Sequence, residues 1–255
     1  MKKLLTLIMC LVLAIGVMSF AACGDSTFKG NYEEVDKATA AEFAESVNGD
    51  SSVLDMKSGM EMEFSIESES DEFSFSMEYD LKCAYNAEQQ MEMEGSVKGK
   101  GEGQTIKGDI YYSNGFMYIN SDGMKIKQAV DYEEFLEEIT SMGSSAIIDI
   151  EGAMTYFESD TTGSIKVYLD KGETESKFKL EVNNFSVEGV KVNGEYYYVF
   201  DANGNLIACK IDVSMTMSYE GYNSDMSVYM VVKAYDGKIS LPSDLDSYQS
   251  GQLPL

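Results

Sequence analysis

Methionine is the residue type whose number and spacing most suggest chemistry in this chain of 255 residues, because 17 of them occur. Met60-Glu-Met62, Met91-Glu-Met93 and Met215-Thr-Met217 each place two thioethers on one face of a strand, since side chains alternate along a strand. Thioethers are soft ligands for Cu(I). They also suit deformable hydrophobic binding surfaces and irregular cores. Copper binding, ligand binding and plain packing are all open, and packing is the simplest.

The four cysteines occur in different sequence contexts. Cys10 lies in an apolar N-terminal run, and Cys23 follows two alanines at its end. Cys83 and Cys209 lie on the apolar side of two predicted strands. They could form a disulfide in an oxidising compartment, or remain two buried thiols. The pattern leaves both possibilities open.

Catalytic groups are scarce. The chain contains no histidine, so neither a Ser-His or Cys-His nucleophile nor a histidine-ligated zinc site can be built. Carboxylate pairs such as Glu61/Glu63 lie on the solvent side of alternating strands, unlike the acid–base pairs of glycosidases. The segment Asp201–Asn205 begins like a calcium loop, but its glycine is fourth instead of sixth. We therefore expect no enzyme activity, no cofactor, and no metal site built from histidines or from this loop.

The overall charge narrows the choice of partners. The formal net charge is −25 at pH 7, which excludes nucleic acid as a favourable partner because its binding depends on cationic contacts to phosphate. The same charge keeps the chain soluble and disfavours direct attraction to anionic lipid headgroups. With 44% hydrophobic residues, the chain can still build a substantial core.

The first 22 residues have the layout of a secretory signal peptide. Two lysines precede an apolar run from Leu4 to Met18 that is short for a membrane span. A cysteine directly after Ala-Ala is typical of the lipidated first residue of a bacterial lipoprotein, although Phe20 stands where leucine is usual. We expect cleavage after residue 22, acylation of Cys23 with chains such as palmitate, and a domain on the extracellular face of the cell membrane.

The apolar spacing predicts two helical regions, against which the strands of the domain would pack. After a tether over residues 23–35, apolar residues at helical spacing predict a helix over 36–47, with Phe43 and Val47 on its buried side. Asp131 can cap a second helical region over 131–157. This region would interrupt the β structure in the middle of the chain.

Elsewhere the apolar period is two, which predicts strands with one buried and one solvated face. Phe73–Tyr85 alternates over roughly 40 Å, a length typical of large curved sheets. Asn114-Gly115 predicts a hairpin turn, and Asn193-Gly194 precedes a similar aromatic pattern that could mark a repeat or an independent turn. The predicted β domain spans 36–245, followed by a loose tail over 246–255.

This order of elements resembles that of lipoproteins with the LolA/LppX-type half-barrel. The chain is also similar to uncharacterised surface lipoproteins of Gram-positive bacteria. The motifs that carry this second resemblance are Tyr112-x-Asn114-Gly115-x-x-Tyr118, Gly123-x-Lys125-x-Lys127, Asp131-Tyr-Glu-Glu-Phe135 and Ile239-Ser-Leu241-Pro242. The resemblance implies an incomplete antiparallel barrel that wraps around helices and can hold acyl chains. It implies no catalytic residues.

The sequence therefore predicts an α+β protein, mostly antiparallel β, whose curved half-barrel sheet wraps over an N-terminal helix and a central helical insertion. We expect an anchored lipoprotein that binds or transfers a hydrophobic, lipid-like ligand on the concave face of this sheet. The alternatives are a structural or adhesive surface module with a filled core, and a methionine-based copper-binding lipoprotein. The candidate ligand-lining residues are Met60, Met62, Phe73, Phe75, Met77, Met215, Met217 and Met230.

Overall fold

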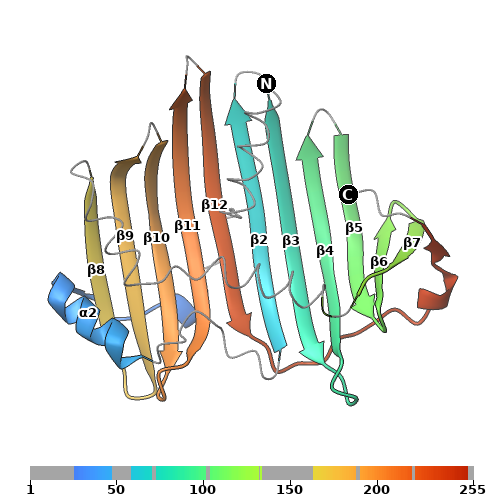
Figure 1. Ribbon diagram of the computed structural model, residues 1–255, viewed down its shortest axis with the longest axis horizontal. Coiled ribbons are helices and arrows are strands. Elements are labelled where there is room, and N and C mark those ends of the chain that lie inside the picture. The colour runs from blue at the N-terminus through green and yellow to red at the C-terminus, as the bar shows by residue number, and fades with distance from the viewer. Residues whose placement is uncertain are drawn as a thin grey trace.

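One large, curved, open sheet dominates the computed structural model (Figure 1). The structure describes residues 26–47, 59–70, 73–101, 104–131, 133, 163–187, 190–219 and 222–251. Within these residues thirteen strands are joined in the order β1-β8-β9-β10-β11-β12-β2-β3-β4-β5-β6-β7-β13. The last pair, β7 with β13, is parallel, and the others are antiparallel. The expectation of a mostly antiparallel β fold is confirmed.

Two meanders make up the sheet. The first contains β2 (Gly59–Ser70), β3 (Ser74–Tyr85), β4 (Met91–Gly101), β5 (Gln104–Ser113), β6 (Phe116–Ser121) and β7 (Met124–Ala129). The second contains β8 (Ser164–Lys171), β9 (Glu175–Val187), β10 (Val190–Asp201), β11 (Leu206–Tyr219) and β12 (Tyr222–Ala234). Pairing of β12 with β2 joins them. The short strands β1 (Glu33–Val35) and β13 (Gln249–Ser250) form the two outer ends of the sheet.

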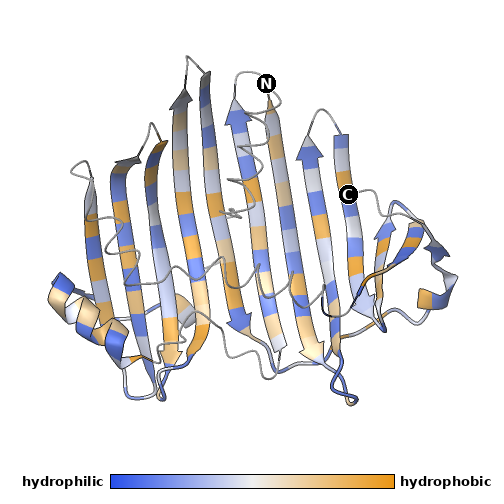
Figure 2. Ribbon diagram, in the orientation of Figure 1, coloured by the Kyte–Doolittle hydropathy of each residue, from blue (hydrophilic) through white to orange (hydrophobic). Residues whose placement is uncertain are grey.

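The two faces of the sheet differ in polarity. Figure 2 shows apolar and polar residues alternating along the long strands. The apolar side chains of β2–β5 and β8–β12 form one continuous core cluster, which also includes Ala40 and Phe43 from the helix α2 (Lys37–Ser46). We call the face that carries this cluster the inner face, and the opposite one the outer face. No helix in the described part of the chain is long and apolar enough to cross a membrane.

The predicted N-terminal helix is confirmed. Asp36 caps it, because its carboxylate accepts a hydrogen bond from the backbone N–H of Thr39 at 2.8 Å. Phe43 anchors the helix to the inner face, with ring centroids 6.0 Å from Phe178 and 5.6 Å from Phe200. The second predicted helical region, 131–157, lies outside the described residues except for Asp131 and Glu133.

Turn chemistry explains the tight connections. Asn114 and Gly115 have positive φ values of 53° and 77°, as a two-residue hairpin turn requires, so this prediction is confirmed. Asn193 and Gly194 instead lie inside β10, where the pairing with β9 shifts register. The two Asn-Gly pairs are therefore not equivalent, and they do not mark a repeat. Asp201–Asn205 is a hairpin turn whose Asp201 carboxylate accepts backbone N–H groups from within the turn.

The C-terminal residues are more ordered than the sequence suggests. After the 3₁₀ turn η2 (Leu245–Ser247), Tyr248 is buried with its ring centroid 5.4 Å from that of Tyr118. β13 then pairs with β7. Residues 246–251, expected as part of a loose tail, are thus attached to the sheet, because one tyrosine supplies the apolar contact. Residues 252–255 lie outside the described part.

Candidate functional site on the inner face

The candidate ligand-lining residues divide into two groups by burial. Met60, Met62, Met215 and Met230 are core residues that are 1–5% exposed. Phe75, Met77 and Met217 are partly buried against the same core. Phe73 is 44% exposed, and its ring stacks on Phe75 with centroids 6.2 Å apart. Seven of the eight residues therefore lie in or against the core cluster of the inner face, and the role of all eight in ligand binding stays a prediction.

Burial on the inner face falls toward one end of β3, β4 and β5. At that end large apolar side chains remain in contact with solvent, and Ile106 is 50% exposed. Met77, Gly99 and Ile106 face one another in register across the three strands. We call this region the apolar strip. Its members are Phe73, Phe75, Met77, Gly99, Gly101 and Ile106.

The glycines of the apolar strip leave room for a methyl group between the neighbouring side chains. A methyl group built on Gly99 would lie 3.8 Å from Cε of Met77 and 4.0 Å from Cβ of Ile106. One on Gly101 would lie 3.5 Å from Cδ2 of Phe75. These are ordinary van der Waals distances. Gly99 itself is buried, so the solvent-accessible apolar surface of the strip comes from side chains such as Phe73 and Ile106.

The opposite end of the same strands is filled. Met60, Cys83, Met93 and Tyr112 form one row in register across β2, β3, β4 and β5, and none is more than 2% exposed. The row brings sulfur atoms together across strands, whereas the sequence pattern had paired methionines along single strands. Burial raises the pKa of the Cys83 thiol to about 12, so the thiol stays protonated. Ordinary core packing is the simplest explanation of this row.

The possible Cys83–Cys209 disulfide is not formed. Both residues are free and buried. Cys209 is on β11 and Cys83 on β3, with β12 and β2 between them. Three strand spacings amount to about 14 Å, and the Cα atoms of a disulfide are rarely more than about 7 Å apart. Of the two possibilities left by the sequence, two buried thiols is the correct one.

The outer face carries a ladder that sequence reasoning missed. Tyr168, Lys179, Tyr197, Lys210 and Tyr229 alternate across β8 to β12, with each ammonium 5.2–5.4 Å from the ring centroids beside it. These are cation–π distances. The run Tyr196-Tyr-Tyr198 was the only sequence signal, because alternation forces its middle residue outward. Which lysines meet that ring depends on strand pairing.

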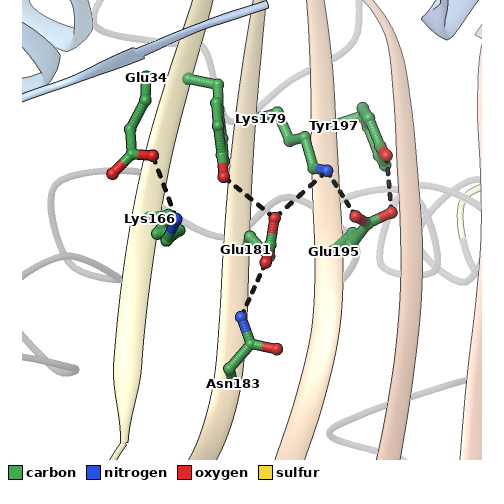
Figure 3. A network of polar contacts seen from close by, with 8 residues as sticks. Glu34, Lys166, Lys179, Glu181, Asn183, Glu195 and Tyr197 are labelled. Atoms are coloured by element: carbon green, nitrogen blue, oxygen red, sulfur yellow. Dashed lines mark hydrogen bonds and ion pairs between the residues drawn. The ribbon is translucent and has the colours of Figure 1, made fainter.

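Two carboxylates complete the ladder (Figure 3). Glu195 is partly buried, which by itself would raise its pKa, but Lys179 and the Tyr197 hydroxyl hold the pKa below its ordinary value. A hydrogen bond from Asn183 lowers the pKa of Glu181, which also accepts one from the Tyr168 hydroxyl at 3.2 Å. All four of these partners favour the ionised carboxylates. Each carboxylate in this network is ion-paired or hydrogen-bonded within the outer face, so we interpret the network as structural.

The segment 26–35, expected to be part of a free tether, is docked on this outer face. Phe28, from the 3₁₀ turn η1 (Ser26–Phe28), is 7% exposed and packs with Val199, Ala208, Tyr229 and Val231. We call residues 26–35 the strap.

Polar contacts hold the strap along its length. Lys177 donates hydrogen bonds from Nζ to the carbonyl oxygens of Thr27 and Lys29 at 2.7 and 2.8 Å. The backbone N–H of Asn31 donates to Asp170 at 3.0 Å. Through β1, the outermost strand, the strap pairs with β8, and the chain then continues into α2 on the inner face. The chain therefore passes around the edge of the sheet from one face to the other.

No protein-family model matches the chain, and no curated protein does. Among solved structures the chain is similar to the crystal structure of LprF from Mycobacterium bovis, with a TM-score of 0.35 and 10% sequence identity. The alignment covers 81% of this chain and 97% of that chain. At this distance the comparison assigns no family, and the half-barrel family expected from the sequence stays a prediction.

Proposed function

We propose that the protein is an extracellular lipoprotein, held at the cell membrane by acyl chains on Cys23, that binds a hydrophobic, lipid-like ligand on the apolar strip. In this proposal the sheet acts as a half-barrel of the LolA/LppX type. The observation that carries the proposal is the exposure of Phe73 and Ile106 beside strand positions without side chains, at Gly99 and Gly101. An apolar face that continues beyond the packed core suggests a hydrophobic partner.

The apolar strip suits a hydrocarbon chain energetically. Each buried methylene contributes about 0.8 kcal/mol. About ten methylenes therefore contribute up to about 8 kcal/mol before the cost of ordering the chain, which corresponds to roughly micromolar affinity at best. The net charge of −25 disfavours an anionic headgroup. An uncharged or zwitterionic lipid is therefore the ligand class we propose.

The proposed role is non-catalytic, and it needs no cofactor. The chain contains no histidine to serve as a general base at neutral pH. Five described carboxylates have lowered pKa values. Glu181 and Glu195 are on the outer face and are engaged by Lys179. Asp36 caps α2, Asp201 closes a hairpin turn, and Asp244 pairs with Lys125. Binding or transfer of the ligand, without bond breaking, is the function we assign to the inner face.

Native mass spectrometry of the purified protein tests the proposal. Ile106→Glu places a charge in the apolar strip at a half-exposed position, so the fold is expected to survive. Lys107→Glu is the matched control, because the neighbouring side chain points to the outer face. We expect co-purified lipid on the wild type and on Lys107→Glu, and its loss from Ile106→Glu. A bare polypeptide mass for the wild type, or equal lipid on both variants, contradicts the proposal.

The second candidate is a structural or adhesive surface module with a filled core. The row of Met60, Cys83, Met93 and Tyr112 favours it, because this end of the inner face is closed to ligands. The two candidates differ only in the apolar strip. A wild-type protein that carries no lipid after purification from its own membranes would support the module. Copper, the third candidate, would appear as a mass shift that a Cu(I) chelator removes.

A further inference from the structure

The strap determines where the chain leaves the sheet toward Cys23. Cys23 precedes Ser26, the first residue of η1, by three positions. Three residues span at most roughly 10 Å when fully extended. Whatever holds Cys23 must therefore lie within about this distance of Ser26. With residues 26–35 docked, the free part of the tether is far shorter than the predicted 23–35.

The docking point lies on the outer face, close to one end of the strands. Phe28 packs on Val199 and Ala208, which are near the Asp201–Asn205 turn that joins β10 to β11. Val231, the neighbour on β12, is close to the end of that strand. We call this region the anchor corner. It is defined by Phe28, Val199, Ala208, Val231 and the Asp201–Asn205 turn.

Three lysines offset negative charge around the anchor corner, although the chain as a whole carries −25. Lys177, Lys210 and Lys233 come from β9, β11 and β12. Each is ion-paired, with Glu175 at 3.7 Å, Asp212 at 3.6 Å and Glu61 at 3.2 Å, respectively. These lysines offset the charges of Glu175, Asp212 and Glu61, whereas Asp201 in the turn accepts hydrogen bonds from Asn203 and Asn205. The three ion pairs reduce the repulsion from an anionic leaflet where the tether requires a close approach.

We propose that the anchor corner is the surface through which the protein contacts the lipid headgroups of its own membrane. This inference rests on the acylated Cys23 of the proposed function. The partner is a phospholipid surface, because the acyl chains must insert within reach of Ser26. The short tether and the docked strap hold that corner against the surface, and the three ion pairs reduce its repulsion.

The same geometry directs the apolar strip away from the bilayer. Register across the sheet places Thr105, beside Ile106, level with Asn193 near the start of β10. Asp201 ends β10 at the anchor corner. The two levels are roughly 25 Å apart along the strands. The strip therefore presents its ligand on the far end of the molecule and not into the anchoring membrane.

Site-specific quenching in proteoliposomes tests this orientation. The acylated protein is purified from membranes and placed in phosphatidylcholine–phosphatidylglycerol vesicles that carry headgroup-linked nitroxide lipids. One variant carries a fluorophore on Asn203→Cys, in the turn at the anchor corner, and the other on Thr105→Cys. Cys83 and Cys209 are buried and do not compete for the label. We expect severalfold stronger quenching at position 203, whereas equal quenching, or stronger quenching at position 105, overturns the proposal.

A strap variant separates docking from anchoring. Phe28→Ala removes the apolar contact of the strap and weakens its docking, so that the chain before β1, roughly 30 Å at full extension from Cys23, can leave the outer face. Quenching at position 203 should then fall toward that at position 105, while the protein stays on the vesicles. Ser26→Ala, at an exposed position of η1, is the matched control and should change nothing. Unchanged quenching in Phe28→Ala contradicts the role of the strap.

Loss of the Cys23 anchor and a wrong membrane orientation give different experimental results. If the wild type does not bind vesicles, Cys23 carries no functional anchor, and the proposed membrane contact is wrong with it. Lipid binding by the apolar strip is measured independently, through Ile106→Glu and Lys107→Glu. A protein that binds ligand but is quenched equally at both positions would retain its proposed function and lose the proposed orientation.

Discussion

Lys177 donates a hydrogen bond from Nζ to the carbonyl oxygen of Thr27 at 2.7 Å, across 150 positions of sequence. A second hydrogen bond from the same ammonium reaches the carbonyl oxygen of Lys29 at 2.8 Å. Both acceptors are backbone atoms, so the contact fixes the path of the chain and does not depend on which side chains the strap carries. One sheet lysine thereby holds the end of the chain that leads to Cys23.

Lys177→Met should therefore loosen the strap. The side chain is 12% exposed, and hydrogen bonds to charged groups contribute about 1.5–3 kcal/mol each. We expect faster amide exchange over residues 27–35 and a lower free energy of unfolding in urea. Lys166→Met is the control, because Lys166 and Glu34 form a pair at 3.2 Å that is largely exposed on both sides. Equal exchange in the two variants would show that Lys177 does not hold the strap.

Cys23→Ser should release the protein into the medium with its fold intact. Acyl chains give the membrane affinity, because each buried methylene contributes about 0.8 kcal/mol. Fractionation of cells that express the variant measures the release, and circular dichroism checks the fold. A variant that remains with the membrane would show that Cys23 is not the anchor.

The two buried thiols should make the protein sensitive to alkali. Burial raises the pKa of Cys83 and of Cys209 from 9.0 to about 12. A folded-state pKa above the unfolded value contributes stability that is fully present below pH 9.0 and is lost as the pH rises toward 12. Urea unfolding at pH 8 and pH 10.5 measures the difference.

Thiol chemistry supplies the control for this alkaline effect. Cys83→Ala with Cys209→Ala should reduce the loss without abolishing it, because burial also raises the pKa of Tyr196 to about 12. In the native wild type neither thiol should react with a disulfide reagent at pH 8, and both should react in urea. Oxidation to an intramolecular disulfide in the folded state would contradict the separation of β3 and β11.

The outer network should make the protein sensitive to acid. Although its partial burial opposes the shift, Lys179 and Tyr197 hold the pKa of Glu195 below its ordinary value of 4.5. A lowered folded-state pKa contributes stability that is present above that value and lost as the pH falls through the folded pKa. Glu195→Gln should lower stability at pH 7 and weaken the dependence between pH 5 and pH 3. An unchanged acid transition in this variant would exclude Glu195 as a contributor.

Substitution by alanine should lower the free energy of unfolding at one glycine and leave it unchanged at another. Gly99→Ala should leave the free energy of unfolding unchanged within about 0.5 kcal/mol, because the new methyl group meets its neighbours at 3.8 Å or more. A methyl group on Gly194 would lie 2.6 Å from the carbonyl oxygen of Asp212 and 2.7 Å from Cα of Val213. Gly194→Ala should therefore cost about 1–3 kcal/mol, as overpacking does. Similar losses in both variants would show that Gly99 has no room for a methyl group.

Local patterns predicted the elements that depend on neighbouring residues. The apolar spacing around Phe43 and the cap at Asp36 were enough for α2, and Asn114-Gly115 was enough for its hairpin. Alternation placed Met60, Met77 and their partners on the apolar face correctly. These features arise within a few residues, because helix spacing, strand alternation and turn φ values are properties of short segments.

Local sequence patterns did not predict the irregularities in strand pairing. Strict alternation along residues 206–219 predicts Ile207 on the same side as Cys209, but a register shift between Val199 and Phe200 places Ile207 with the outer cluster instead. One extra residue in a strand reverses the faces beyond it. Nothing in the sequence around Leu206 distinguishes a bulge from a regular strand.

The sequence by itself determined the polarity of each strand, the helix and the turns. Only the tertiary structure decided that β12 pairs with β2, which separates Cys83 from Cys209 and leaves Ile106 far from the anchor corner. It also decided that Lys177 meets the strap. The physical reason is that long alternating strands can pair in many orders with similar local energy, so the choice is made by contacts between residues distant in sequence. The strap illustrates this, since its seven polar or small residues indicate a free tether until Phe28 is seen to be buried against Ala208 and Val231.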